Sequence, residues 1–264
     1  MNIALIGYGK MGGIELGYGS DLDLVFLHNC PIDDVTNGRK EVLAGQFYSK
    51  LAQRITHIFN TRMNSGILYE LDMRLRPSGN SGVLVIHVDS FEQYQTKEAW
   101  TWEHQALVRT RAIYGHQALV EQFERIRKTT LSNTRNINEL KKSVIEMRNK
   151  MQNHLDKSTL TESDIKQSKG GLVDIEFLAQ YLVLAYYEKF PEANLPSDNI
   201  RIFEMLSQWQ VLTNDECQQL ISHYCQLRDF GHHCVLKNKA NLMPLTEFSS
   251  HAEVVINIFK KYLH

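Results

Sequence analysis

The sequence predicts an α+β chain in which a small mixed β-sheet domain is followed by an all-α helical bundle. Short apolar runs, which are typical of β-strands, occur only before about residue 90. After that point apolar residues recur every three to four positions, which is the spacing of helices that bury one face. With 264 residues, 43% of them hydrophobic, the chain is long enough to form two modest cores.

The first part of the chain mixes strands with one long helix. Each predicted strand is a short apolar run that ends at a glycine or a polar turn. These strands cover 3–6, 22–27, 67–75 and 83–88. Between the second and third strands, apolar residues follow a helical period over 39–62. We therefore expect a small sheet domain over residues 1–96.

The second part contains only helical patterns. The run that begins at Leu172 is apolar nearly all round, as expected of a helix at the centre of a bundle. The predicted helices cover 140–155, 172–187, 200–209, 215–236 and 252–263, with breaks at 156–171, 190–196 and 237–244. We expect these helices to form an up-and-down bundle over residues 97–264.

Composition restricts the partners and the cellular compartment that we expect for the chain. The formal charge is −1, so no global basic field indicates nucleic acid, and no apolar run is long enough to predict a membrane span. Four cysteines without a C-x-x-C pair indicate reduced thiols and a cytoplasmic protein. Because a strand pattern follows Met1 at once, we expect this to be a domain of a longer chain.

Three aspartates form the strongest candidate site. Asp21 and Asp23 open the predicted strand 22–27, and side chains two residues apart on a strand share one face. Asp72 lies in the predicted strand 67–75 and supplies a third carboxylate. Three carboxylates close together repel one another, but they suit Mg²⁺, which prefers oxygen ligands and accompanies phosphates. The pattern predicts a magnesium site for phosphoryl or nucleotidyl transfer.

A glycine pattern near the start offers a competing interpretation. Gly7, Gly9 and Gly12 follow a predicted strand and match the G-x-G-x-x-G pattern of dinucleotide-binding domains. That fold requires a full helix after the last glycine. Here the next strand begins at Leu22, only ten residues later, and the interval contains three more glycines. The spacing argues against the dinucleotide fold.

The same glycines fit a known family. Segments 7–23, 69–79, 99–109 and 170–177 resemble the signatures of the glutamine synthetase adenylyltransferase family, within the DNA polymerase beta-like nucleotidyltransferases. The resemblance implies Mg²⁺-dependent transfer of AMP from ATP to a tyrosine hydroxyl of glutamine synthetase. It also implies that Asp21, Asp23 and Asp72 hold the metal, and that Asp72 helps to deprotonate the hydroxyl. Control by glutamine and a PII-type nitrogen regulatory protein is implied as well.

Members of that family contain two nucleotidyltransferase halves, of which one attaches AMP and the other removes it. This chain has a single Asp-x-Asp site, so it covers one half at most. Segments 7–10 and 100–105 resemble the C-terminal, adenylylating half. Three alternatives stay open: the AMP-removing half, a nucleotidyltransferase with RNA or a small molecule as acceptor, and a regulatory module that binds nucleotide without turnover.

Six further residues are candidates for binding the nucleotide. Each also has a plain structural interpretation: the glycines shape the backbone, Ser20 caps a turn, and the arginines neutralise nearby acids. In the functional interpretation their backbone N–H groups, hydroxyl or cations bind phosphate. The six are Lys10, Gly12, Gly13, Ser20, Arg74 and Arg76. Arg74 and Arg76 alternate with Asp72, so on the predicted strand all three share one face.

Other polar residues are ambiguous. We expect residues 100–111 to form one helix that packs its indoles on the sheet, with Glu103 or Arg109 as possible contacts to nucleotide or metal. Asp174 and Glu176 interrupt an apolar helix, which indicates either an internal ion pair or a contact near the site. The histidines and cysteines over 223–234 match no zinc spacing, and we interpret them as ordinary helix residues.

Overall fold

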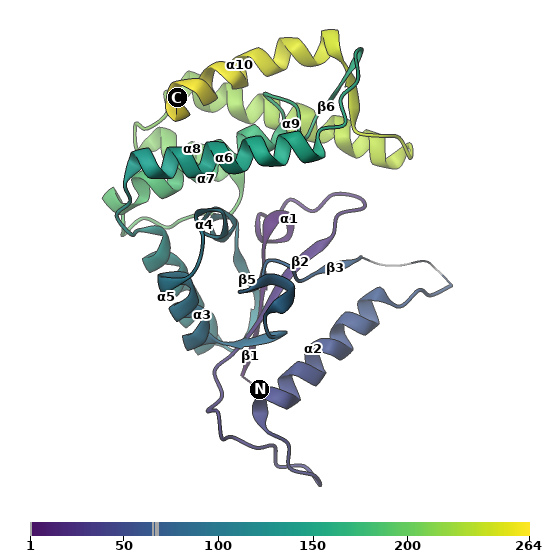
Figure 1. The fold of residues 1–264 in the computed structure, drawn as a ribbon, viewed down its shortest axis with the longest axis vertical. Helices are drawn as coiled ribbons and strands as arrows, with labels where there is room; N and C mark the ends of the chain where they lie inside the picture. Colours follow the sequence, from purple (N-terminus) through teal and green to yellow (C-terminus); the bar gives the residue numbers. More distant parts are fainter. Residues whose placement is uncertain (1, 65, 67–68) are drawn as a thin grey trace. The chain divides into compact units, whose positions relative to one another are not determined.

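The structure is a computed structural model that describes residues 2–64, 66 and 69–264. The chain forms two compact units, Met1–Thr130 and Leu131–His264. Figure 1 shows the mixed sheet and its helices in the first unit and a helical bundle in the second. The predicted α+β class is therefore confirmed, while the expected domain limits, 1–96 and 97–264, stay a prediction.

One five-stranded mixed sheet organises the first unit. Its strands are β1 (Ile3–Gly7), β2 (Leu22–His28), β3 (Leu71–Asp72), β4 (Val85–His87) and β5 (Arg111–Gly115). The order is β3-β2-β1-β5, and β4 also pairs with β2, further along the same edge as β3. β1 is antiparallel to β2 and β5, whereas β3 and β4 are parallel to β2. β2 is thus paired along both edges, and its side chains are buried on both faces, which explains why 22–27 is almost continuously apolar.

Among the described residues of this unit, five helices accompany the sheet. They are α1 (Gly9–Gly12), α2 (Ala44–Asn60), α3 (Val88–Lys97), α4 (Thr101–Val108) and α5 (Gln117–Leu131), with a 3₁₀ turn η1 (Gly79–Ser81) before β4. The long helix α2 packs Tyr48 and Ala52 in one core cluster with Phe26 of β2 and Val85 of β4. This packing holds β2 and β4 against a common support.

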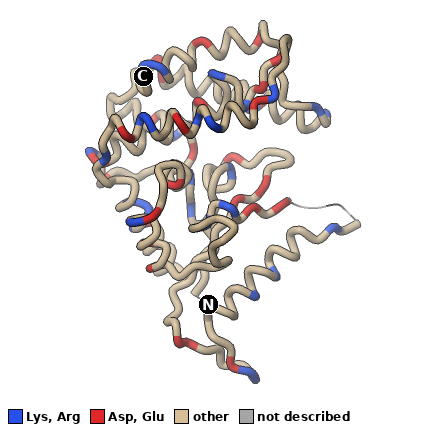
Figure 2. The backbone as a smooth tube through the Cα atoms, in the orientation of Figure 1, with Lys and Arg blue, Asp and Glu red and all other residues tan. Residues whose placement is uncertain are grey.

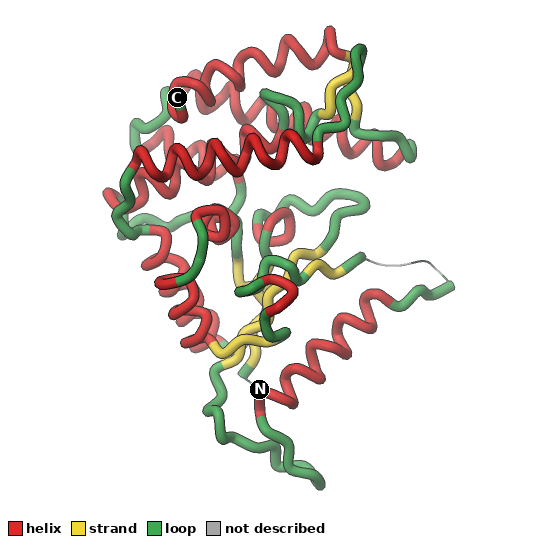
Figure 3. The backbone as a smooth tube through the Cα atoms, viewed as in Figure 1, coloured by secondary structure: helices red, strands yellow, loops and turns green. Residues whose placement is uncertain are grey.

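The second unit is a bundle around one central helix. Its helices are α6 (Ile137–Leu155), α7 (Leu172–Tyr186), α8 (Asn199–Gln208), α9 (Asn214–Leu236) and α10 (Leu245–Leu263), with η2 (Tyr187–Lys189) after α7. α7 packs against each of the other four, which accounts for its nearly all-round apolar sequence. Two short strands, β6 (Glu162–Asp164) and β7 (Leu242–Pro244), pair in antiparallel fashion. β6 lies in the connection between α6 and α7, and β7 in the connection between α9 and α10 (Figure 3).

The predicted elements differ from the structure in three places. The predicted strand 67–75 ends at Asp72, because the following residues turn back and the Arg74 N–H bonds the Asp72 carboxylate; Ile67 and Leu68 lie outside the described residues. Strands β5, β6 and β7 were not expected after residue 90. The helix expected over 100–111 ends at Val108, and Arg111 already belongs to β5. These late strands are short and partly exposed, so they lack the apolar run that identifies a strand.

A buried ion pair joins α6 to the start of α7. Arg148 Nε donates to Asp174 Oδ1, and the two side chains are only 4% and 8% exposed. Arg148 Nη2 also donates to Gln167 O at 2.7 Å, and the Gly170 N–H donates to Asp174 Oδ2 at 2.6 Å. Of the two interpretations open for Asp174, the structure supports an internal ion pair.

We predict that D174A lowers the free energy of unfolding of the bundle by about 3–5 kcal/mol, because it leaves the Arg148 charge buried without its counter-ion. The control is K142A, which removes the exposed pair between Lys142 and Glu146 and should change the same quantity by less than about 0.5 kcal/mol. Urea unfolding followed by circular dichroism measures both. Equal losses in the two variants would contradict the assigned role of Asp174.

Candidate functional site

The register of two parallel strands brings two of the three aspartates together. Leu22 pairs with Leu71, and Asp23 pairs with Asp72, so these carboxylates leave the same face of the sheet side by side. Asp21 precedes β2 by one residue and lies two positions before Asp23. Figure 2 shows acidic positions gathered where β2 and β3 meet, next to a basic position. The predicted convergence of Asp23 and Asp72 is therefore seen in the backbone.

A hollow of about 410 Å³ opens beside these strands. Seven of its ten lining residues are polar or charged, and Asp21 and Asp72 are among them. The remaining lining residues are Thr56, Glu70, Leu71, Met73, Arg74, Arg76, Asn80 and Leu84. This volume is within the range of small-molecule sites in proteins. Both predicted arginines and two of the three predicted aspartates thus line one hollow.

Arg74 holds the third aspartate through a forked contact. Its Nε donates to both oxygens of Asp72, at 3.0 and 2.8 Å, its Nη2 also donates to Oδ2, and its backbone N–H donates to Oδ1 at 2.8 Å. The Arg74 side chain is 72% exposed, whereas that of Asp72 is 16% exposed. Hydrogen bonding from the Arg74 side chain is the main cause that lowers the pKa of Asp72.

The same guanidinium acts on all three carboxylates. Its pKa is raised, chiefly by its hydrogen bond to Asp72 and further by the negative charges of Asp23 and Asp21. Arg74 is therefore a cation that helps to balance the acidic cluster in this structure. Because it is exposed and held from one side only, it can exchange Asp72 for another anion of the same shape, such as a phosphate.

Arg76 has a different environment from Arg74. Its Nη1 donates to Met73 O at 2.7 Å, and its other nitrogens donate to Gly82 O and Asn80 O at 3.3 Å. These three carbonyls belong to the turn that connects β3 to β4. The expectation that both arginines alternate with Asp72 along a strand was wrong, because the strand ends at Asp72; Arg76 instead holds the turn together at the edge of the hollow.

Lys10 and Ser20 contact each other where the loop after α1 returns to β2. Lys10 Nζ lies 3.5 Å from Ser20 Oγ, and the Gly17 N–H donates to the same hydroxyl at 3.1 Å. Ser20 is buried and directly precedes Asp21. In this structure the hydroxyl closes the turn that delivers Asp21 to the site.

Three glycines are required by close packing around α1. A Cβ on Gly9, whose φ is +50°, would lie 2.6 Å from Asp23 Oδ2, so the Asp23 carboxylate lies directly against the start of α1. A Cβ on Gly12 would lie 2.2 Å from Arg109 O, and one on Gly13 would lie 2.8 Å from Arg109 Nη2. Gly9 was not among the predicted site residues, although it is the middle glycine of the G-x-G-x-x-G pattern.

Residues from the segment after α4 support this turn. Arg109 forms a buried ion pair with Glu15, their side chains being 4% and 9% exposed. Arg111 donates from Nε to Gly12 O at 3.4 Å and from Nη2 to Met11 O at 3.3 Å. Glu103 accepts hydrogen bonds from the Trp100 N–H and from Tyr94 Oη. Sequence reasoning proposed Glu103 and Arg109 for the nucleotide or metal, but the contacts described here belong to the scaffold.

The carboxylate cluster has the oxygen ligands that a divalent cation needs, but its side chains are not arranged as a closed metal site here. Within the described part of the chain, no three His, Cys, Asp or Glu side chains converge closely enough to enclose a metal ion. Asp72 is bonded to Arg74 instead. The donor set itself, two carboxylates at the start of β2 and one at the end of the adjacent β3, offers the hard oxygen ligands that Mg²⁺ prefers. Release of Arg74 is the change that would make Asp72 available.

Comparison with known proteins finds relatives for nearly the whole chain. The model of the family "Glutamate-ammonia ligase adenylyltransferase" matches residues 1–126, and that of "GlnD PII-uridylyltransferase" matches residues 138–250. The chain is 51% identical over 263 residues to a Shewanella oneidensis protein described as a "Bifunctional glutamine synthetase adenylyltransferase/adenylyl-removing enzyme". The alignment covers 98% of this chain and 28% of that relative, so the chain spans just over a quarter of its length.

We predict that R74A raises the pKa of Asp72 toward its ordinary value, because the variant removes the hydrogen bonds and the charge that favour the carboxylate. The lowered pKa also determines how the stability of the fold depends on pH. Because the folded-state pKa of Asp72 is depressed, its carboxylate contributes stability above the unfolded-state pKa, and that stability is lost as the pH falls through the folded-state pKa. Carbon-13 NMR of the Asp72 carboxyl measures the shift. The exposed Lys97 on α3 gives the control K97A, and an unchanged Asp72 pKa in R74A would refute the assignment.

Proposed function

Because this chain is homologous to the glutamine synthetase adenylyltransferases over nearly all of its length, we propose that it transfers AMP from ATP to a tyrosine hydroxyl of glutamine synthetase. The observation that carries the proposal is the direct register of Asp23 with Asp72, beside a polar hollow that Asp21 and Asp72 both line. A nucleotidyl transfer needs carboxylates in this arrangement, whereas a protein core does not.

In this proposal Asp21, Asp23 and Asp72 hold Mg²⁺. The metal would supply positive charge to the phosphate oxygens and bring the reacting oxygens into line. The remaining work belongs to the chain. The α1 turn, with Gly12 and Gly13 packed on Arg109, fixes where Asp23 lies. Lys10, Ser20 and Arg76 stand around the same strands and are proposed to bind the phosphate chain.

Arg74 and Asp72 are proposed to exchange partners during the reaction. With no nucleotide bound, the guanidinium keeps Asp72 ionised and makes it a weak base. A triphosphate presents the same forked acceptor geometry as a carboxylate and carries more charge, so it competes for Arg74. Release from the guanidinium frees the Asp72 carboxylate to contact the metal and the acceptor hydroxyl, which needs a proton acceptor. Asp72 is therefore the residue proposed to assist that deprotonation.

We assign the adenylylating direction to this half of the family because of segments 7–10 and 100–105. The alternative is the removal of AMP by phosphate at the same carboxylates, and the printed name of the relative contains both activities. Incubation with ATP and unmodified glutamine synthetase, or with phosphate and adenylylated glutamine synthetase, separates the two. AMP attached to a tyrosine in the first mixture supports our assignment, and AMP or ADP released only in the second supports the alternative.

Regulation and location are further parts of the proposal. The match of residues 138–250 to a PII-uridylyltransferase family supports a link between the helical unit and a PII-type nitrogen regulatory protein. Cys30, Cys217, Cys225 and Cys234 are all free thiols, as a reducing cytoplasm would keep them. No helix in the described part of the chain has a stretch long and apolar enough to cross a bilayer.

We predict that D23N and D72N each lower AMP transfer by at least about 100-fold while leaving the fold intact, because each removes one charge from the metal-binding set. Transfer of labelled AMP from ATP measures the effect, and circular dichroism checks the fold. D33N is the matched control, since Asp33 is an exposed carboxylate of the same unit, and it should keep full activity. Near-normal transfer by D23N or D72N would overturn the proposed metal role.

A further inference from the structure

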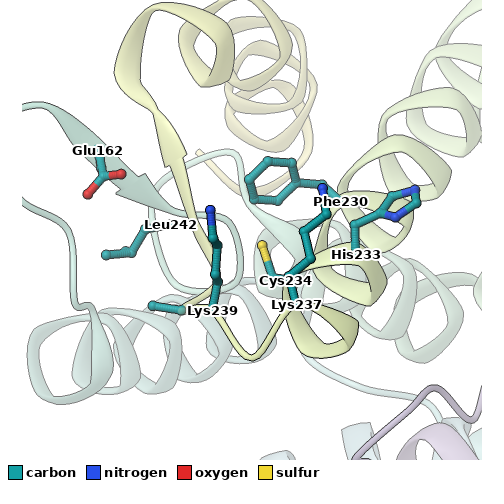
Figure 4. A pocket seen from close by; sticks show the side chains of 8 residues that line it. Glu162, Phe230, His233, Cys234, Lys237, Lys239 and Leu242 are labelled. Atoms are coloured by element: carbon teal, nitrogen blue, oxygen red, sulfur yellow. The ribbon is translucent and has the colours of Figure 1, made fainter.

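A second hollow, in the helical unit, is separate from the acidic cluster in composition and charge. It has a volume of about 600 Å³ and lies between the end of α9 and the strands β6 and β7. Figure 4 shows its lining side chains. They are Glu162, Phe230, His233, Cys234, Lys237, Lys239, Ala240 and Leu242. None of them takes part in the proposed nucleotidyl transfer.

The end of α9 explains how two lysines come to the same wall. Asn238 has a left-handed backbone, with φ of +50°. The Lys239 N–H donates to Cys234 O at 2.8 Å, and the Asn238 N–H donates to Val235 O at 3.0 Å, which is the double hydrogen bond of a Schellman turn. The turn folds the chain back over the last turn of the helix, so that Lys237 and Lys239 both return toward Cys234.

The two ammonium groups act on one place in the hollow. Burial raises the pKa of the Cys234 thiol, and the charges of Lys237 and Lys239 both oppose that rise. In Figure 4 the Cys234 sulfur lies between the two lysine side chains. Neither ammonium group makes an ion pair or a hydrogen bond with the residues that the structure describes. The two lysines therefore form a positive wall whose ammonium groups are not paired with any described residue.

The neighbouring hollow extends this positive field. A further cavity, of about 400 Å³, shares Lys239, Ala240 and Leu242 with this hollow. Its wall also includes Lys157 and Lys166. The acid in that cavity, Asp164, is already bonded to the backbone N–H groups of Lys166 and Gln167, at 2.8 and 3.1 Å. The negative charge of Asp164 is therefore partly balanced by the backbone N–H groups of this loop.

The remaining walls restrict what could lie against these lysines. The Phe230 ring, the buried Cys234 and Leu242 provide an apolar surface. Glu162 stands across the hollow from Lys239 in Figure 4, where it would repel a second negative group. A ligand that suits all walls has one anionic end at the lysines and an uncharged, apolar body.

We propose that this hollow binds a small organic anion, which places a phosphate or carboxylate head between Lys237 and Lys239 and an uncharged apolar body against Phe230 and Leu242. Phosphate and carboxylate heads share this chemistry, and both can be tested. The site is independent of whether the first unit attaches or removes AMP.

Isothermal titration of the whole chain at low salt tests the proposal with phenyl phosphate and with benzoate as probes. We expect saturable binding of at least one of them at millimolar concentration or below, and none of phenol, which lacks the charge. The double variant K237Q/K239Q should weaken binding by about fivefold or more, from two partly exposed charge contacts. E162Q should keep or strengthen binding, because it removes the opposing carboxylate.

The control replaces a lysine outside the hollow. Lys150 on α6 is exposed in the same unit, and K150Q should bind the probes as the unchanged chain does. Circular dichroism confirms that the variants fold. Equal binding by K237Q/K239Q and the unchanged chain would overturn the proposal, as would no saturable binding of either probe at 10 mM, a concentration well above that expected for a site of this kind. A preference between the two probes identifies the head group.

Discussion

The parallel pairing of β2 with β3 is the constraint on which the candidate active site depends. β2 is held on one edge by β1 and on the other by β3 and β4, so its position is fixed from both sides. Asp23 and Asp72 are partners in that register. A shift of one residue would turn one of the two carboxylates to the opposite face of the sheet. The chemistry therefore follows from backbone hydrogen bonds rather than from side-chain packing.

Placing like charges in adjacent positions has an electrostatic cost, which the exposed guanidinium of Arg74 offsets, since it interacts with all three carboxylates. The scaffold behind them is held by the buried ion pair of Arg109 with Glu15 and by glycines that leave no room for a side chain. An exposed cation in front of a closely packed support suits a site that must admit a charged substrate without reorganising its acids.

The local patterns in the sequence predicted much of this arrangement. The spacing of Asp21 and Asp23 indicated one strand face, and the helical periods located α2, α6, α7, α8 and α9, because both depend on residues close in sequence. The different roles of Arg74 and Arg76 could not be predicted, since they depend on the chain turning immediately after Asp72. The partner of Asp174 is 26 residues away, and no periodicity indicates Arg148. The strand β5 alternates poorly between buried and exposed residues, so it carried no strand signal.

Because β3 is short, the candidate site can lose its geometry while the rest of the unit stays folded. Among the described residues, two pairs join this strand to β2, whereas five pairs join β1 to β2. Amide groups in so short a ladder open by local fluctuation at a free energy far below that of global unfolding. Slow hydrogen exchange in β1 and rapid exchange in β3 would then coexist in one folded molecule. A denaturation midpoint would report the core and reveal nothing of whether the third aspartate is in register.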